Sequence, residues 1–141
     1  MRLGFVCLLL LLLACNKIET AQTLNQSDHD YIRSLNLLEE GETIIKFYSE
    51  YKLNVAGNFI TNRRMAQYWI DERDSEKNHI ESAYYKDIAA IEMVQNVGLT
   101  YSPYLLVKRK DGTQFKVSVD GDEAEIRSFC EAAVLEWNRS K

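Results

Sequence analysis

The most constraining feature of the sequence is an amphipathic stripe near its C-terminus. Asp122 is a favourable helix N-cap, and Glu125 stands three residues later, as in a capping box. Apolar side chains follow at spacings of three and four residues: Ile126, Phe129, Cys130, Ala133, Val134 and Trp137. This spacing predicts a helix with one apolar face. Because the rest of the chain offers only a β-sheet to bury that face, we expect the helix to cover one edge or end of the sheet.

The region before this helix has a two-residue period with frequent turn signals, which is typical of strands. We predict seven strand-like stretches, at residues 42–55, 59–61, 65–70, 79–84, 88–93, 101–108 and 114–119. In the first, Ile45, Phe47, Tyr51, Leu53 and Val55 are expected on one face. Turns are expected at residues 56–58 and 96–98, and Lys110-Asp111-Gly112 is the clearest hairpin signal. The sequence therefore predicts a mainly β domain with a C-terminal α-helix.

The first fifteen residues have the pattern of an exported precursor. Arg2 supplies a positive charge, and residues 3–14 are apolar, which is too short for a spanning helix of about twenty residues. The stretch ends in Leu12-Leu13-Ala14-Cys15, which resembles the lipobox of bacterial lipoproteins. The resemblance implies removal of residues 1–14 and lipidation of Cys15. An ordinary signal peptide cut elsewhere is the alternative, and Cys7 is a weaker lipidation candidate because only six residues precede it.

Localisation follows from the same resemblance. The protein is expected to be exported and anchored by lipid to the bacterial cell envelope. Residue 16 is Asn, whereas Asp there resembles an inner-membrane retention signal of Gram-negative lipoproteins. In a Gram-negative cell, the periplasmic side of the outer membrane is therefore the expected location.

The mature chain is short and acidic. Removing residues 1–14 from the 141 leaves 127 residues, and Arg2 is the only charge lost from 17 basic and 21 acidic residues, so the net charge becomes −5. This balance argues against nucleic-acid binding and against attraction to anionic lipid headgroups. Residues 15–30 are polar and are predicted to form a lipidated N-terminus and flexible tether, followed by one globular domain over residues 31–141. A short helix is expected over residues 29–38, ended by Gly41, with Ile32, Leu35 and Leu38 inward.

Cys130 is the one cysteine left after lipidation of Cys15 and loss of Cys7, so no intramolecular disulfide is expected. It lies on the apolar face of the predicted helix, which favours a small buried side chain over a reactive thiol. With two histidines and no cysteine pair, no metal site or cofactor is expected.

Four local motifs, in order, resemble those of bacterial pleckstrin-homology-like (PH-like) domains. They are residues 41–45, 57–64, 85–92 and 110–115, within a region of resemblance over residues 40–138. The resemblance implies a bent antiparallel β-barrel or sandwich of about seven strands, capped by one helix. Phosphoinositide binding is not implied, because the first hairpin loop, residues 54–58, contains no Lys or Arg.

Candidate ligand-binding residues are Arg63, Arg64, Tyr68 and Trp69, a pattern that can hold an anion or a peptide carboxylate. The alternative is that the arginines pair with nearby carboxylates such as Asp71 or Glu72. Tyr84, Tyr85, Tyr101 and Tyr104 are expected to pack on a sheet face or to form an exposed interaction rim.

No set of catalytic residues stands out. The acidic residues between 71 and 76 lack the glycine and spacing of a calcium loop, and Ser34 and His79 lack a glycine-flanked nucleophile motif. We therefore expect a non-enzymatic interaction or scaffold module, bound to the membrane through its N-terminal lipid and to an envelope protein partner. The alternative is a small-ligand or lipid-binding protein that uses the mouth of the barrel.

Overall fold

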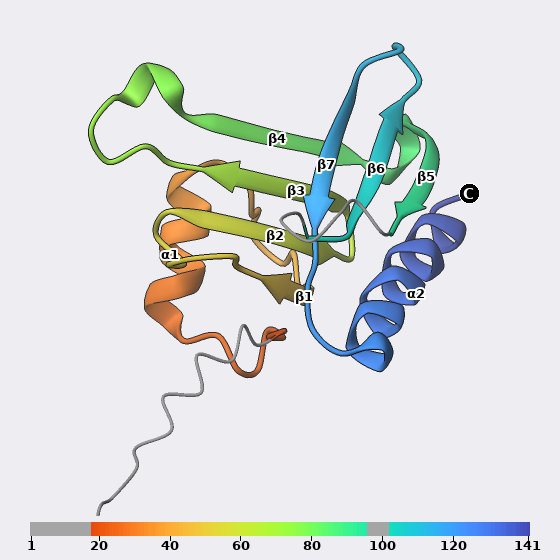
Figure 1. Cartoon of the computed structure of the whole chain (residues 1–141), viewed down its shortest axis with the longest axis horizontal. Helices are drawn as coiled ribbons and strands as arrows, with labels where there is room; N and C mark the ends of the chain where they lie inside the picture. Colours follow the sequence, from red (N-terminus) through yellow and green to blue (C-terminus); the bar gives the residue numbers. More distant parts are fainter. Residues whose placement is uncertain (1–17, 96–101) are drawn as a thin grey trace, which may run out of the picture.

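The computed structural model describes residues 18–95 and 102–141 (Figure 1). Within these residues, seven strands form two antiparallel sheets. The first sheet has the order β1-β2-β3-β4, with β1 Ile44–Tyr48, β2 Ala56–Thr61, β3 Arg64–Trp69 and β4 His79–Tyr84. The second has the order β5-β6-β7, with β5 Ile88–Val94, β6 Tyr104–Arg109 and β7 Gln114–Ser118. The helices are α1 Gln26–Ser34 and α2 Glu123–Arg139, and the 3-10 turns are η1 Ser75–Lys77 and η2 Tyr85–Asp87.

This architecture confirms the predicted mainly β fold with a C-terminal helix. No strand of the first sheet pairs with a strand of the second among the described residues, so the two sheets are not closed into a barrel. Of the two forms that the resemblance implied, the structure has the sandwich. The predicted signal peptide, Cys7, Cys15, the turn at residues 96–98 and Tyr101 lie outside the described residues.

The main core lies between the sheets and under α2. Ile60, Met65 and Ala83 come from three neighbouring strands of the first sheet, and Val107 and Val117 come from the second. All five side chains are buried. The inner space is therefore occupied by apolar side chains that interdigitate as in other protein interiors.

Helix α2 completes this core, as the amphipathic stripe predicted. The side chains of Asp122 and Glu125 each accept a hydrogen bond from the other's backbone N–H, at 2.8 and 2.9 Å, which confirms the capping box. Phe129 and Ala133 are fully buried, and α2 contacts β1, β2, β5 and η2. Val134, which the stripe placed inward, is 40% exposed, because the stripe is wider than the surface that the sheets offer.

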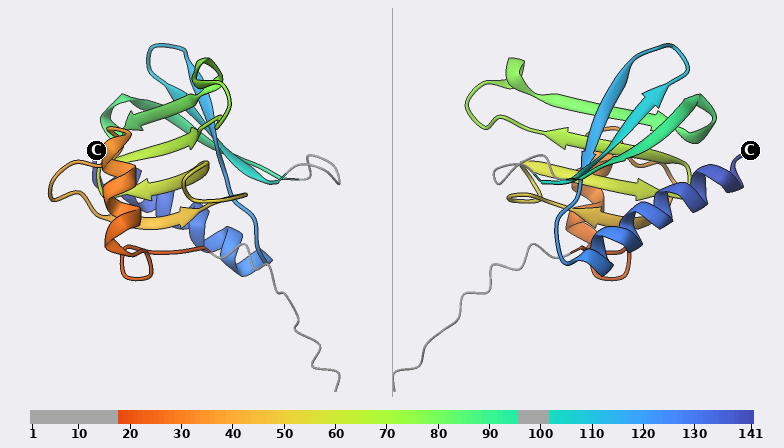
Figure 2. Two further views of the ribbon diagram at one scale, coloured as in Figure 1. Left: turned by 90° about the vertical axis from the view of Figure 1, so that its left-hand side faces the viewer. Right: turned by 45° about the vertical axis from the view of Figure 1, so that its right-hand side comes forward.

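A second core lies on the outer face of the first sheet, under α1 (Figure 2). Phe59 and Ala66, which face each other across β2 and β3, belong to it, whereas their neighbours Ile60 and Met65 point to the inner face. This alternation follows from the pleat of the strands. Ile32 of α1 is fully buried here.

For residues 18–30, the structure corrects the prediction of a flexible tether over residues 15–30. The backbones of Glu19 and Phe47 exchange two hydrogen bonds, of 2.7 and 2.8 Å, and the N–H of Ala21 donates to the carbonyl of Ile44 at 3.1 Å. Residues 19–21 thus lie along the outer edge of β1. Leu24 is 5% exposed in the second core. The polar composition hid this docking, because one buried leucine and a strand edge suffice to hold the segment.

The first helix also differs from its predicted bounds. It begins at Gln26 rather than 29, because Asn25 and Asp28 form a capping box, and it ends at Ser34, well before Gly41. Leu38 is buried as expected, but from the segment that follows the helix.

The first strand is shorter than its predicted range. β1 ends at Tyr48 instead of residue 55, and an irregularity between Ile44 and Lys46 shifts its register. Tyr51 lies beyond the end of the strand and is 60% exposed, although the alternation predicted it to face inward. The register shift instead separates Ile45 from Phe47, which were predicted on one face: Ile45 packs against the main core, whereas Phe47 is buried in the second core on the other side of the sheet. A two-residue period cannot be extended across such a shift, because each one-residue slip reverses the faces.

Candidate functional site

The four ligand-binding candidates from the sequence do not converge on one site. Arg64 and Tyr68 are 3% and 1% exposed, on β3, and Arg63 lies in the turn before that strand. Trp69, at the end of β3, is 40% exposed. The arginines and Trp69 lie at opposite ends of the strand, so the four residues do not line one shared site.

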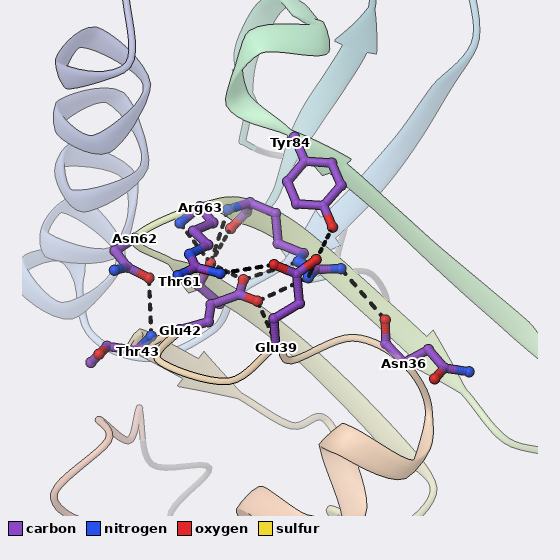
Figure 3. Close-up of polar contacts among 9 residues, drawn as sticks. Asn36, Glu39, Glu42, Thr43, Thr61, Asn62, Arg63 and Tyr84 are labelled. Carbon is purple, nitrogen blue, oxygen red and sulfur yellow. Dashed lines mark hydrogen bonds and ion pairs between the residues drawn. The ribbon is translucent and has the colours of Figure 1, made fainter.

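The two arginines pair with carboxylates that the sequence analysis did not consider (Figure 3). Arg64 binds Glu42 through Nε and Nη2, with two contacts of 2.9 Å, and the Glu42 side chain is fully buried. Glu39 accepts from Nη1 of Arg63 at 2.9 Å and lies 3.0 Å from Nη2 of Arg64. The arginines are therefore paired, as the alternative proposed, but with Glu39 and Glu42 instead of Asp71 or Glu72.

Neighbouring hydroxyl groups complete this ion network. Thr61 donates to Oε1 of Glu42 at 2.6 Å, and the hydroxyl of Tyr84 donates to Glu39. The hydrogen bond from Tyr84, followed by that from Arg63, holds the pKa of Glu39 below its ordinary value. An added anion would have to compete with two carboxylates here. The network fastens the segment before β1 to the β2–β3 turn and does not present a binding site.

Tyr68 has a packing role. Its hydroxyl donates to the carbonyl of Leu53, and its ring lies against the backbone of Gly57, its partner on β2. A Cβ at Gly57 would come within 2.4 Å of the ring, so this close approach requires glycine.

The best candidate site is a groove of about 360 Å³ between the first sheet and β7, a size typical of binding clefts. Figure 1 shows β7 crossing the first sheet at a steep angle. The groove is lined by Glu50, Asn58, Gln67, Trp69, His79 and Glu81 on one side and by Gln114, Phe115, Lys116 and Ser118 on the other. Of the four sequence candidates, only Trp69 belongs to it.

Strand register explains why this groove is polar. Ile60, Met65 and Ala83 lie side by side on the inner face of the first sheet and enter the core. Two residues along each strand, on the same face, the corresponding row is Asn58, Gln67 and Glu81. The inner face therefore changes from apolar to polar where the sheets separate.

Asn58 links the two walls of the groove. It is 3% exposed, its Nδ2 donates to Oε2 of Glu50 at 2.6 Å, and its Oδ1 accepts from the backbone N–H of Ser118 at 2.8 Å. Among the described residues, Glu50 forms no ion pair. Although much of Glu50 is exposed, partial desolvation of its carboxyl group raises its pKa above the ordinary value, against the smaller effects of its hydrogen bonds.

Sequence analysis missed Asn58 and Glu50 as site residues, and it considered His79 only as a member of a catalytic set. It placed Asn58 in a turn, whereas β2 already begins at Ala56. The available signal was the occurrence of polar side chains at inward positions of three successive strands.

No family model matches the chain, and no curated protein matches it. The chain is similar to the crystal structure of a DUF1696 family protein with a pleckstrin-homology domain from Shewanella loihica PV-4. The identity is 15%, the TM-score is 0.49, and the match covers 84% of this chain and 98% of the other. At these values the likeness carries nothing about function.

Two other hollows, each of about 480 Å³, have different linings. One is lined by Lys86, Lys110 and Lys141 beside Trp137. The other lies over Cys130, Val134 and Leu135 on the outer side of α2 and is lined mainly by apolar atoms. The Cys130 thiol is half-buried, its Sγ lies 3.1 Å from Sδ of Met93, and burial raises its pKa to about 11. These features favour the predicted inert side chain over a reactive thiol.

Within residues 18–95 and 102–141, no helix is long and apolar enough to cross a membrane. In the same residues, no group of three or more His, Cys, Asp or Glu side chains is placed to hold a metal ion.

Proposed function

We propose that the protein is a lipid-anchored, non-enzymatic interaction module of the bacterial cell envelope, which binds its partner in the groove between the first sheet and β7. The observation that carries this proposal is the convergence of polar side chains from β2, β3, β4 and β7 on one preformed groove, with the exposed Trp69 at its rim. Aromatic side chains beside a few fixed polar groups are typical of protein binding sites.

The anchor is proposed from the lipobox, and the docked N-terminal segment supports a close placement at the membrane. Residues 19–21 lie on β1, so only a few residues separate Cys15 from the domain surface. The four steps from Cys15 to Glu19 span at most about 14 Å when extended. A lipid on Cys15 would therefore hold the domain next to the bilayer instead of on a long tether.

The anchor is tested with a Cys15→Ser variant. We expect the variant to leave the membrane fraction, and the wild-type protein to carry the added mass of acyl chains on its N-terminal cysteine. A variant that stays in the membrane with unchanged mass would refute the lipid anchor.

Partner binding is tested separately in intact cells. A photoreactive amino acid at the exposed, groove-lining position of Gln114 should give a defined crosslinked product. The matched control places the same amino acid at Arg127, an exposed position on α2. Crosslinking that is equal at both positions, or absent at Gln114, would contradict a partner in the groove.

The second candidate is a small-ligand binder, favoured only by the volume of the groove. The space between the sheets is filled by the main core, so a ligand inside a barrel mouth has no support within the described residues. A ligand in the groove would contact Trp69, so small-molecule extracts of the envelope should change the tryptophan fluorescence of the protein. A change that is absent in the Trp69→Phe variant would favour this function. The variant leaves Trp137 as the chain's other tryptophan.

A further inference from the structure

The strand β7 is the outer strand of the second sheet and pairs only with β6 among the described residues. Such an edge normally exposes a row of unpaired N–H and C=O groups, which proteins tend to cover. The outer edge of β1 is covered in this way, because the backbone of Glu19 pairs with Phe47. The comparable edge of β7 has no such cover from residues 18–95 or 102–141, and it borders the groove.

The hydrogen bonds at the two ends of β7 define which backbone groups face outward. Thr113 accepts from Arg109, and the N–H of Val119 donates to Pro103, so the odd-numbered residues point toward β6. Ser118 points the other way, since its N–H donates to Asn58. Because the direction alternates along an antiparallel strand, the N–H and C=O groups of Gln114 and Lys116 also point away from β6.

These outward groups form a short pairing edge. The two residues are two positions apart, which places equivalent groups about 7 Å apart along the strand. Asn58 already occupies the N–H of Ser118 and so ends the edge at that side. The edge therefore has the length to pair with an extended segment of about four residues.

The charges in the groove favour a basic segment. Glu81 is already paired with Arg109 at 2.6 Å, and the Nζ of Lys116 lies over the ring of Tyr104, 4.6 Å from its centroid. The carboxylate of Glu50 is held by the amide of Asn58 and lacks a cationic partner among the described residues. A lysine or arginine from outside would supply the missing charge.

Two exposed rings add an apolar contact. Trp69 and His79 face each other across β3 and β4, on the face that lines the groove. Both residues are exposed. The stem of a long basic side chain, or an apolar neighbour, can lie on the indole, and a cation over its face gains further attraction.

We infer that the partner is an extended peptide segment that adds as a strand to the open edge of β7 and places a lysine or arginine side chain at Glu50. This inference rests on the proposed function, because it names the chemistry of the partner for the same groove. Main-chain hydrogen bonds supply affinity in this mode of recognition, and pockets for alternate side chains supply selectivity.

The test uses the full chain, purified with its lipid in detergent, and fluorescein-labelled seven-residue peptides of alternating Val and Thr. One Arg is moved through all seven positions, and Gln replaces it in matched control peptides. Fluorescence anisotropy should show Arg positions of one parity binding about tenfold more tightly than their Gln controls, and Glu50→Gln should abolish that difference. Equal binding of all peptides, or none at millimolar concentration, would overturn the inference.

Strand addition is tested separately from charge. Lys116→Pro removes the outward N–H at an edge position where proline is tolerated, whereas Lys116→Ala removes only the side chain. We expect the proline variant to weaken binding about tenfold and the alanine variant to have less than about a twofold effect. The same loss in both variants would exclude backbone pairing.

A measurement on the unchanged protein guards against misfolding of the proline variant. Two sets of peptides are compared, one methylated on the odd-numbered and one on the even-numbered backbone nitrogens. One set should lose binding and the other should keep it, because only alternate N–H groups of an added strand face β7. Equal effects in both sets would contradict strand addition. If every peptide fails while crosslinking from Gln114 still yields a defined product, the interaction module stands and the peptide inference falls.

Discussion

The side-chain oxygen of Asn58 accepts a hydrogen bond from the backbone N–H of Ser118, 2.8 Å away, so an amide on the first sheet holds the end of the second. The same amide donates to Glu50 at 2.6 Å. We expect Asn58→Ala to destabilise the protein by about 1–3 kcal/mol, because it removes both bonds and leaves the partly buried N–H of Ser118 without its acceptor. Urea unfolding measures this loss. A change of less than about 0.5 kcal/mol in the free energy of unfolding would mean that the two hydrogen bonds of Asn58 do not stabilise the fold.

Asn58→Asp is the informative companion. The new carboxylate still accepts from Ser118 but faces the carboxylate of Glu50, where two like charges cannot both ionise cheaply. The pair's pKa is then raised in the folded state, so its stability is present at low pH and lost as pH rises. We expect Asn58→Asp to be less stable than Asn58→Ala at pH 7 and to regain stability on acidification. Parallel pH profiles for the two variants would refute the contact.

The buried pair of Arg64 and Glu42 predicts strongly unequal effects of single and double substitutions. Glu42→Gln leaves the Arg64 guanidinium largely buried without its bidentate partner, and we expect a loss of about 3–5 kcal/mol. The double variant Glu42→Leu, Arg64→Met should lose less, because no unpaired charge is left. Glu39→Gln is the control, since this carboxylate is exposed and its ion pairs, screened by solvent, should contribute little to stability. Additive losses in a double-mutant cycle would contradict the pairing.

Features held by interactions between residues close in the sequence could be predicted, whereas features held by interactions between distant residues could not. Helix α2 was predictable because its capping box and its stripe are local, and β7 because its hairpin signal precedes an alternating strand. The partners of Arg64 were not, because Glu42 lies 22 residues earlier and nothing local prefers it to Asp71 or Glu72.

The groove shows the same limit. Trp69 was a candidate because it is near Arg63 and Arg64 in the sequence, but the structure places it in a groove whose other residues include side chains from β4 and β7. Composition also misled at the N-terminus, where the buried side chain of Leu24 holds a segment whose polar residues suggested flexibility.

Glu50 is predicted to destabilise the folded protein at neutral pH, because its carboxyl group is partly desolvated in the groove. Burial raises its folded-state pKa, so its contribution to stability is present below the unfolded-state pKa and is lost as pH rises through the folded-state value. Glu50→Gln should therefore stabilise the protein at pH 7 and raise its melting temperature. Because the residue is exposed, the gain in the free energy of unfolding should be less than about 1 kcal/mol, and no gain is expected at acidic pH. His79, Glu81 and Lys116 line the same groove as Glu50. Lys116→Ala is the control for removing a charge from this groove at a position other than Glu50. A gain that is independent of pH would point to a cause other than this carboxyl group.

Gly57 is predicted to admit no larger residue. A Cβ there would lie 2.4 Å from the ring of Tyr68, which is buried and tied to Leu53 through its hydroxyl. We expect Gly57→Ala to cost about 1–3 kcal/mol, as other over-packed positions do. Gly112→Ala is a useful contrast, since its space is open and only its positive φ of 90° opposes a side chain. Partial rescue of Gly57→Ala by Tyr68→Leu, but no rescue of Gly112→Ala, would locate the clash at the ring.

The docked N-terminal segment gives a prediction that separates it from a flexible tether. Leu24→Ala should destabilise the protein by about 2–4 kcal/mol, because Leu24 is 5% exposed among the side chains of the second core. Gln22→Ala, at an exposed position two residues earlier, should have almost no effect. Hydrogen exchange supplies an independent readout, since the Phe47 N–H donates to the carbonyl of Glu19 at 2.8 Å and should be protected. Loss of that protection in Leu24→Ala, with Gln22→Ala unchanged, is expected if the segment docks as one unit. If Leu24→Ala is neutral and the Phe47 amide exchanges rapidly, the segment is a flexible tether after all, and the domain can move away from the proposed lipid anchor.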